Sequence, residues 1–212
     1  MSEGFTYESG KTEKLETYEW DNLWWEHAND KENKERILII GDSISCGYRS
    51  WVNRELEGKI YADGLGTSKS LDNDHFLKLI EYVIGQQSNC KLIQFNNGLH
   101  GWHLSKQAYK EHYLSFVRYF KENHPDKKLV LALSTPVRNR ENILQLAERN
   151  EEVILRNQAV LEIAESEGIC VNDLYSMVID HPEYYSADGV HLTEEGYKVL
   201  AKPCVKVIAD AI

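Results

Sequence analysis

The stretch Ile37-Leu38-Ile39-Ile40-Gly41-Asp42-Ser43-Ile44-Ser45 contains the feature that decides the fold class. Residues 37–40 form an uninterrupted apolar run, which is typical of a strand buried on both faces. Gly41 ends the run, and Ser43 stands where the chain is expected to open a helix. In sheets of this kind, ligands bind beyond the carboxyl ends of the strands. The stretch therefore predicts a buried strand followed by a turn at a ligand-binding edge.

Short apolar runs alternate with longer amphipathic stretches along the rest of the chain. Further strands are predicted at 59–62, 91–95, 129–133 and 168–172, and helices at 50–56, 74–84, 105–122, 141–167 and 193–212. This alternation favours parallel strands joined by right-handed crossovers. The predicted fold class is α/β, a three-layer α/β/α sandwich with flavodoxin-like layering and a central parallel sheet of about five strands.

The length of 212 residues predicts one domain with an extension. Residues 1–35 are acidic and rich in aromatic side chains, and they are predicted to form an N-terminal arm. Within this arm, 18–28 is expected to lie against the domain as a short helix. Residues 36–212 are predicted to form the domain itself.

Charge and apolar run length narrow the classes of partner. Lys and Arg number 24 against 34 Asp and Glu, which gives a net charge of −10. Without a basic stripe, the chain is not expected to bind nucleic acid. Its apolar runs are far shorter than the roughly 20 residues of a membrane span, and its start lacks the pattern of a signal peptide. We therefore expect a cytoplasmic protein with no membrane partner and four free cysteines; the sequence leaves the oligomeric state open.

The predicted helix at 141–167 carries two asparagines, Asn150 and Asn157, inside the arc of its apolar stripe. Buried amides need hydrogen-bond partners, and loop backbone is the simplest source of them. If they are buried, the asparagines are predicted to hold loops beyond the strand ends. The alternative is that the helix is rotated enough to expose them to solvent.

Two polar motifs, one early and one late, carry the chemistry. Asp188 stands three residues before His191, so its carboxylate can hold the imidazole while the other ring nitrogen takes a proton from a serine. Ser43 opens a helix, whose N-terminus supplies N–H groups and partial positive charge that suit an oxyanion. Gly41-Asp42-Ser43 alone is weak evidence, because Asp and Ser are also common turn and N-cap residues.

Gly41-Asp42-Ser43 together with Asp188-x-x-His191, on an α/β alternation, resembles the SGNH (GDSL) hydrolase family over residues 36–212. The resemblance implies an esterase or acylhydrolase with a Ser-His-Asp triad. It implies that Ser43 is the nucleophile, that His191 is the general base and later the acid, and that Asp188 orients the imidazole. No metal and no organic cofactor is implied.

The same resemblance implies an oxyanion hole. The family's third sequence block usually reads Gly-x-Asn-Asp, and here residues 98–101 read Gly-Leu-His-Gly, so a histidine stands where asparagine is usual. A histidine N–H can also donate to an oxyanion. The expected donors are the backbone N–H groups of Ser43 and Gly66 and the side chain of His100, with Gly64 and Asn97 as their rivals.

The expected substrate is a small-molecule ester, hydrolysed through an acyl-enzyme. The resemblance suggests small acyl groups, such as acetyl on carbohydrate. A lysophospholipase or thioesterase, and a catalytically impaired binding module on the same scaffold, are the alternatives. Asp42 and Trp102 are candidates for substrate contacts, although core packing explains Trp102 equally well. His100-x-x-His103 has the spacing of a metal pair, but no cluster completes it, so no metal site is expected.

Overall fold

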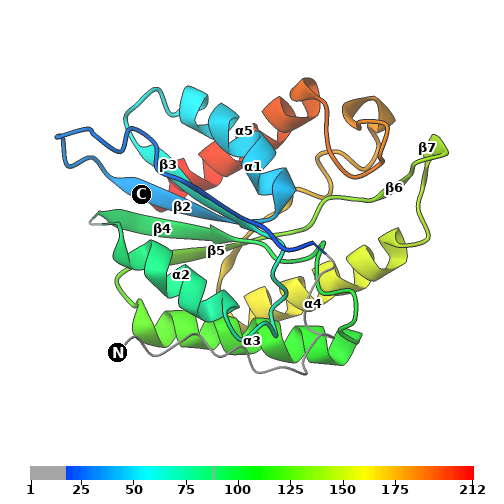
Figure 1. The fold of residues 1–212 in the computed structure, drawn as a ribbon, viewed down its shortest axis with the longest axis horizontal. Helices are drawn as coiled ribbons and strands as arrows, with labels where there is room; N and C mark the ends of the chain where they lie inside the picture. The colour runs from blue at the N-terminus through cyan, green and yellow to red at the C-terminus, as the bar shows by residue number, and fades with distance from the viewer. Residues whose placement is uncertain (1–17, 88) are drawn as a thin grey trace, which may run out of the picture.

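The computed structural model describes residues 18–87 and 89–212, and its centre is a twisted six-stranded sheet (Figure 1). In spatial order the strands are β1 (Asp21–Trp24), β3 (Tyr61–Thr67), β2 (Arg36–Gly41), β4 (Cys90–Phe95), β5 (Lys128–Ala132) and β8 (Cys170–Asn172). All neighbours pair in parallel except β1 and β3. The predicted α/β class is confirmed, with five parallel strands and one antiparallel edge strand.

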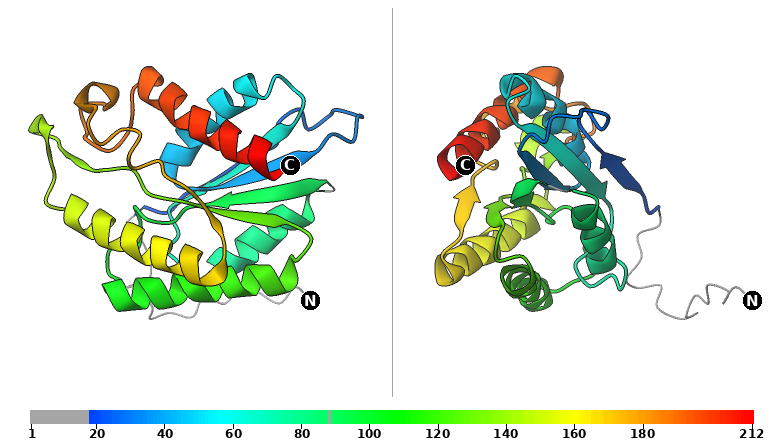
Figure 2. Two further views of the ribbon diagram at one scale, coloured as in Figure 1. Left: turned by 180° about the vertical axis from the view of Figure 1, so that it is seen from behind. Right: turned by 90° about the vertical axis from the view of Figure 1, so that its left-hand side faces the viewer.

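Helices cover both faces of the sheet, as Figures 1 and 2 show. The helices α1 (Ser43–Glu55) and α5 (Glu194–Ala211) lie on one face, and α2 (Phe76–Gly85), α3 (Lys106–Asn123) and α4 (Asn150–Glu167) lie on the other. Successive strand residues point to opposite faces. Accordingly, Ile37 and Ile39 pack with the α1 and α5 side, and Leu38 and Ile40 with the α2 and α3 side. The continuous apolar run at 37–40 is thus explained by burial on both faces.

Helix α4 is shorter than predicted, because its predicted first part forms a hairpin. Strands β6 (Arg138–Asn139) and β7 (Asn142–Leu146) pair antiparallel, and Leu144 is 72% exposed there. The Asn139 side chain accepts the Glu141 N–H at 2.8 Å and forms a tight turn, a conformation for which asparagine is well suited. The prediction of helix over 141–149 is therefore wrong.

The two asparagines of α4 are buried and hold backbone, as predicted. Asn150 accepts the Val137 N–H at 3.0 Å. Asn157 accepts the Ser134 N–H and donates to the Ser134 carbonyl, both at 2.9 Å. These bonds fix the chain directly after β5, at the carboxyl edge of the sheet.

The 18–28 part of the arm lies against the domain, as predicted, but it forms a strand rather than a helix. Strand β1 runs along the free edge of β3, with Asp21 opposite Thr67 and Trp24 opposite Gly64. Pairing with β1 supplies hydrogen-bond partners to the backbone of β3, which would otherwise be an exposed edge strand. This stabilisation depends on the tertiary structure, so the local sequence pattern does not show it. Residues 1–17 of the predicted arm lie outside the described residues, and the boundary at 35/36 stays a prediction.

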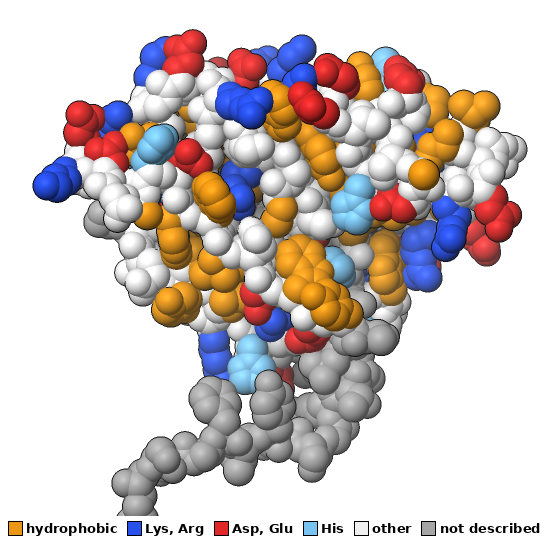
Figure 3. All heavy atoms as spheres, turned by 45° about the horizontal axis from the view of Figure 1, so that its top comes forward, with side chains coloured by type: hydrophobic (Ala, Val, Ile, Leu, Met, Phe, Trp, Pro, Cys, Tyr) orange, Lys and Arg blue, Asp and Glu red, His pale blue; other side chains and the backbone are white. Residues whose placement is uncertain are grey.

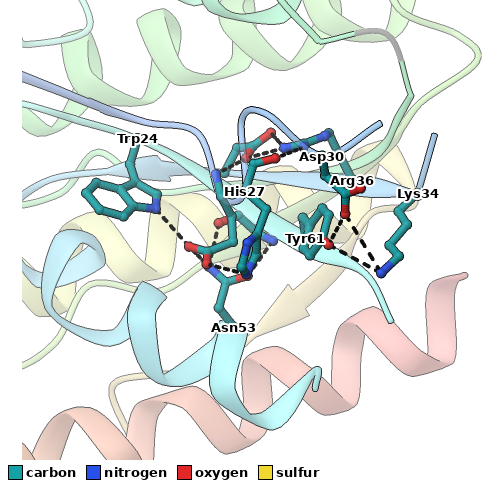
Figure 4. A network of polar contacts seen from close by, with 10 residues as sticks. Trp24, His27, Asp30, Lys34, Arg36, Asn53 and Tyr61 are labelled. Atoms are coloured by element: carbon teal, nitrogen blue, oxygen red, sulfur yellow. Dashed lines mark hydrogen bonds and ion pairs between the residues drawn. The ribbon is translucent and has the colours of Figure 1, made fainter. Parts of the chain in front are cut away.

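A polar network holds the segment after β1 (Figure 4). Asp63 is fully buried, and it accepts the Glu26 N–H at 2.7 Å and the Arg36 guanidinium at 2.7 Å. The Tyr61 hydroxyl donates to Asp30, and Asn53 of α1 donates to the Glu26 carboxylate at 3.1 Å. The segment from β1 to β2 is therefore a fixed part of the fold. No helix in the described part of the chain is long and apolar enough to cross a membrane.

Candidate active site

Ser43 is the first residue of α1, two residues after β2 ends at Gly41. Asp42 is the N-cap, and its carboxylate accepts the Ile44 N–H at 2.9 Å. The first N–H groups of a helix have no partner within the helix and carry partial positive charge. The half-buried Ser43 side chain therefore stands beside groups that favour a developing negative charge. Helix α1 begins seven residues earlier than the predicted 50–56.

The loop that carries Asp188 and His191 follows the short 3-10 helix η2 (Pro182–Tyr184) and leads into α5. Its base is closed by the bridge between Tyr185 and Leu192, and the Ser186 N–H donates to the His191 carbonyl at 2.8 Å. Gly189 has φ of +76°, and a Cβ there would lie 2.2 Å from the Arg138 carbonyl oxygen. Only glycine fits this crossing, which packs the loop against β6.

Ser43, His191 and Asp188 form one hydrogen-bonded chain. The Ser43 Oγ lies 2.8 Å from the His191 Nε2, and the His191 Nδ1 lies 2.6 Å from the Asp188 Oδ2. Both are hydrogen-bond distances. A carboxylate, an imidazole and a hydroxyl in this order can remove the hydroxyl proton and stabilise the resulting imidazolium. The structure thus brings the three predicted catalytic residues together.

Asp188 is held ionised by its neighbours. Burial raises the pKa of its carboxyl, but hydrogen bonds from the His191 ring, the Val190 and His191 amides and the Ser186 hydroxyl outweigh burial and lower that pKa well below its usual value. The ionised form is therefore present throughout the neutral range. The Ser186 hydroxyl, which donates to Asp188 Oδ1 at 2.8 Å, completes the set of donors around this carboxylate.

Gly66, the expected second oxyanion donor, lies at the end of β3 opposite Gly41. A Cβ there would lie 2.2 Å from Cys46 Sγ and 3.4 Å from the Asp42 carbonyl oxygen, whereas one on Gly64 would meet Arg49, a residue farther along α1. Gly66 is therefore the glycine beside the start of α1.

The pairing of β3 with β1 bears on whether the Gly66 N–H can donate to an oxyanion. The Ser68 N–H donates to the Trp20 carbonyl at 3.1 Å. Hydrogen-bonded pairs alternate along an antiparallel ladder, so Gly66, which faces Asn22, occupies a hydrogen-bonded position and directs its N–H toward β1. Donation by Gly66 to an oxyanion stays a prediction, and it requires this amide to leave the ladder.

His100 and Asn97 lie on the loop after β4, and they differ in what holds them. Asn97 is 5% exposed, and its amide nitrogen donates to the Lys69 carbonyl at 2.9 Å. Burial raises the pKa of Asp42, the residue before Ser43, and the nearby His100 opposes that rise. Asn97 thus ties two loops together, and His100 lies on the Asp42 side. The Asn97 amide is therefore engaged with the Lys69 carbonyl, and the donor role of His100 stays a prediction.

Arg156 of α4 holds the His100 loop, and no signal in the sequence indicated it. The guanidinium is 4% exposed and donates to three carbonyls, those of Gly98 at 3.1 Å, His100 at 2.6 Å and Gly101 at 2.7 Å. Hydrogen bonds from a charged donor are stronger than those between neutral groups. Arg156 therefore fixes the backbone from which the His100 ring projects.

Trp102 packs against guanidinium groups at the end of this loop. Those of Arg149 and Arg156 lie 4.7 Å and 4.4 Å from its ring centroid. These contacts show packing, and the predicted substrate contact of Trp102 stays a prediction. The neighbouring His103 pairs with Asp72 at 3.0 Å. Among residues 18–87 and 89–212, no group of three metal-ligating side chains lies together.

Asp42 is buried and caps α1, and its predicted contact with a substrate stays a prediction. It is 4% exposed, its Oδ1 caps α1, and its buried Oδ2 accepts no hydrogen bond from any described residue. Burial raises the pKa of the Asp42 carboxyl, opposed by the nearby His100 and by backbone donors. The residue is therefore a helix cap with a poorly solvated charge.

Replacing this cap by asparagine is expected to stabilise the protein at neutral pH. Because the folded-state pKa is raised, the ionised carboxylate costs stability once the pH exceeds the unfolded-state value of about 3.9. Asp42→Asn keeps the capping oxygen and removes the charge. We expect a gain of about 1 kcal/mol at pH 7, or about 2–4 °C in Tm. Thermal unfolding should show the gain shrinking as the pH is lowered and wild-type Asp42 protonates. An equal gain at every pH, or the same gain in the exposed control Asp180→Asn, would contradict the assignment.

Comparison with known proteins shows what the chain is similar to. The profile of the GDSL-like lipase/acylhydrolase family matches residues 39–199. A GDSL-like lipase from Bacteroides thetaiotaomicron superposes with a TM-score of 0.67 at 19% identity, covering 86% of this chain and 91% of that one. An acetyl xylan esterase superposes with a TM-score of 0.64 at 17% identity, covering 82% of this chain and 99% of that one. The aryl esterase of M. smegmatis superposes with a TM-score of 0.68 at 12% identity, covering 84% of this chain and 100% of that one. A search of curated proteins found no match.

Proposed function

The chain belongs to the GDSL-like lipase/acylhydrolase family, and on that premise we propose that it is a serine esterase that hydrolyses esters of small acyl groups through an acyl-enzyme. The observation that carries the proposal is the hydrogen-bonded chain from the Ser43 hydroxyl through the His191 ring to the Asp188 carboxylate, with distances of 2.8 Å and 2.6 Å. This arrangement supplies a base within reach of the nucleophile's proton.

In the proposed reaction, Ser43 Oγ attacks the ester carbonyl carbon while His191 Nε2 takes the hydroxyl proton. The tetrahedral intermediate carries an oxyanion, which the Ser43 N–H at the start of α1 and the His100 side chain stabilise. His191 then gives the proton to the leaving alcohol, and an ester of Ser43 is left. Water, deprotonated by His191, attacks this ester and releases the acid and free Ser43.

A short acyl group on a carbohydrate or other small alcohol is the proposed substrate class. Support comes from fold relatives that include an acetyl xylan esterase and an aryl esterase. On the face drawn in Figure 3, acidic and basic side chains are interspersed with apolar ones, which suits a small ligand better than a polyanion. The four cysteines are unpaired, as expected in a reducing cytoplasm, which is the location we propose.

Catalytic impairment is the alternative suggested by the altered third block, where His100 replaces the family's usual asparagine. That alternative would be favoured by a long distance between Ser43 and His191. The 2.8 Å contact between them supports the esterase instead.

Hydrolysis of p-nitrophenyl esters tests the proposal. Purified protein should hydrolyse the acetate with the highest kcat/KM and the butyrate and octanoate progressively more slowly. Ser43→Ala serves as the control for protein-independent hydrolysis. A preference for the octanoate would move the function to the lysophospholipase or thioesterase alternative, and no hydrolysis of any chain length would favour the binding module.

His100→Ala is expected to lower kcat about 100- to 1,000-fold with little change in KM, because an oxyanion donor acts mainly in the transition state. His100→Asn, which restores the residue usual in the family, should recover part of the rate. Asn97→Ala should have a smaller effect, since its amide donates to the Lys69 carbonyl. Steady-state kinetics on p-nitrophenyl acetate measures all three variants. A larger loss in Asn97→Ala than in His100→Ala would reverse the assignment.

A further inference from the structure

Trp20, from the arm before β1, reaches the predicted active site. Its indole lies against the His100 ring, with centroids 6.3 Å apart and planes at 75°, an edge-to-face arrangement. Aromatic pairs prefer this geometry because the positive edge of one ring meets the negative face of the other. The contact joins a segment outside the family match at 39–199 to the ring predicted to donate to the oxyanion.

The same indole lies over the end of β3. A Cβ on Gly66 would be 3.2 Å from an indole carbon, so the absence of a side chain there lets the indole approach the strand. Trp20 therefore lies beside two residues of the predicted oxyanion region, Gly66 and His100.

The backbone of Trp20 is fixed from both sides. Its N–H donates to Ser68 Oγ at 2.9 Å, and the Ser68 N–H donates to its carbonyl at 3.1 Å. The next residue, Asp21, pairs with Thr67 and accepts the Lys69 ammonium at 2.8 Å. The polar network around Asp63 holds the other end of the segment (Figure 4). The indole is thus presented to His100 from a rigid position.

Two different elements therefore act on His100. Arg156 holds the loop carbonyls and so fixes the backbone, but a backbone bond leaves the torsions of the side chain free. Trp20 contacts the ring itself. A ring that must aim an N–H at an oxyanion gains from such a contact, because misorientation of catalytic groups is costly.

We propose that Trp20 is a positioning residue, which holds the His100 ring in the orientation that the reaction uses. The inference rests on the proposed esterase function and on the donor role of His100. Trp20→Ala should lower kcat for p-nitrophenyl acetate about tenfold, which corresponds to about 1.4 kcal/mol in the barrier, with KM within about twofold. Trp20→Phe keeps an aromatic partner and should retain most of the rate.

Trp24→Ala is the matched control. Trp24 is the last residue of β1, four residues after Trp20, and is 49% exposed. The Trp24 indole contacts Glu26 and the Arg49 guanidinium rather than His100. Its loss should leave kcat unchanged. A similar fall in kcat for both variants would assign the effect to the whole segment that contains Trp20 and β1, and would overturn the proposal.

A double-mutant cycle separates positioning from general destabilisation. In the His100→Ala background, Trp20→Ala should have no further effect on kcat, because the ring that it positions is gone. Equal tenfold losses in both backgrounds would contradict the proposal. Thermal unfolding of each variant identifies losses caused by unfolding, and Trp20→Phe is used in the cycle if Trp20→Ala does not fold.

A second readout does not depend on activity. In proton–carbon NMR spectra, with His100→Ala used to assign the ring signals, Trp20→Ala should shift the His100 ring protons because the indole ring current is lost. Unchanged His100 signals would overturn the proposal whether or not the protein is an esterase. Absence of ester hydrolysis in the wild type, with the NMR shift present, would instead reject the proposed function alone.

Discussion

Ser43→Ala should abolish ester hydrolysis, with kcat falling by about 10⁴- to 10⁶-fold while the fold is kept. The substitution removes only the hydroxyl group, whose partner is His191 Nε2 at 2.8 Å. Ser43 is half-buried at the start of α1, and its replacement leaves the Asp42 cap on the Ile44 amide in place. The variant should therefore unfold within about 2 °C of the wild type, as expected for a change of less than about 1 kcal/mol.

The control for this variant is Ser50→Ala, the same substitution at an exposed position of α1. It should keep wild-type kcat, because it lies outside the hydrogen-bonded chain of Ser43. Steady-state kinetics with p-nitrophenyl acetate and thermal unfolding measure both variants. Full activity in Ser43→Ala would reject Ser43 as the nucleophile.

Asp188→Asn should lower kcat by between ten- and 10,000-fold, with little change in KM. The Asp188 Oδ1 accepts the Val190 and His191 amides, and Oδ2 accepts the His191 ring. Asparagine has a single acceptor oxygen. With that oxygen on the amides, its NH₂ faces the His191 Nδ1 and favours the tautomer whose Nε2 already carries a proton. Such a ring cannot accept the proton of Ser43.

Asp180→Asn, an exposed change in the same segment, is the control for Asp188→Asn and should leave kcat unaltered. Ring nitrogen NMR provides an independent check, since the tautomer of His191 should change in Asp188→Asn. An unchanged kcat with an unchanged tautomer would show that another group orients the imidazole.

The central strands were predictable because burial on both faces leaves a local signal. The apolar runs at 37–40 and 91–95 correspond to β2 and β4. Strand β3 extends to Thr67, beyond the predicted 59–62, since Asp63-Gly64-Leu65-Gly66 is not an apolar run. Its pairing with β1 and β2 makes it a strand.

The two wrong predictions, a helix at 18–28 and a helix over 141–149, also concern segments whose structure depends on tertiary contacts. Strand β1 is mostly exposed and short, so its four residues carry no period-2 pattern and its conformation depends on the edge of β3. The hairpin of β6 and β7 was assigned to a helix because Ile143, Leu146 and Ala147 stand at helical spacing. The turn at Asn139 instead joins two antiparallel strands, in which residues 143 and 146 point to opposite faces.

For the site, three residues were predictable from two short motifs. Asp188 and His191 are neighbours in sequence, and Ser43 is marked by its place after a buried strand. The contacts of Arg156 and Trp20 with the His100 loop were not predictable, because each joins residues far apart in the chain. Such contacts are set by the packing of α4 and of the segment that leads into β1, and they leave no local sequence pattern.

Labelling with a serine-directed organophosphonate tests the central claim, that Ser43 is a nucleophile activated by His191. The reagent forms a covalent bond only with an activated serine oxygen, and peptide mass spectrometry locates it. We expect one label per chain, on the peptide that contains Ser43, at a rate that parallels the loss of esterase activity, and no label in Ser43→Ala. Labelling at another residue, or undiminished hydrolysis by fully labelled protein, would contradict the assignment.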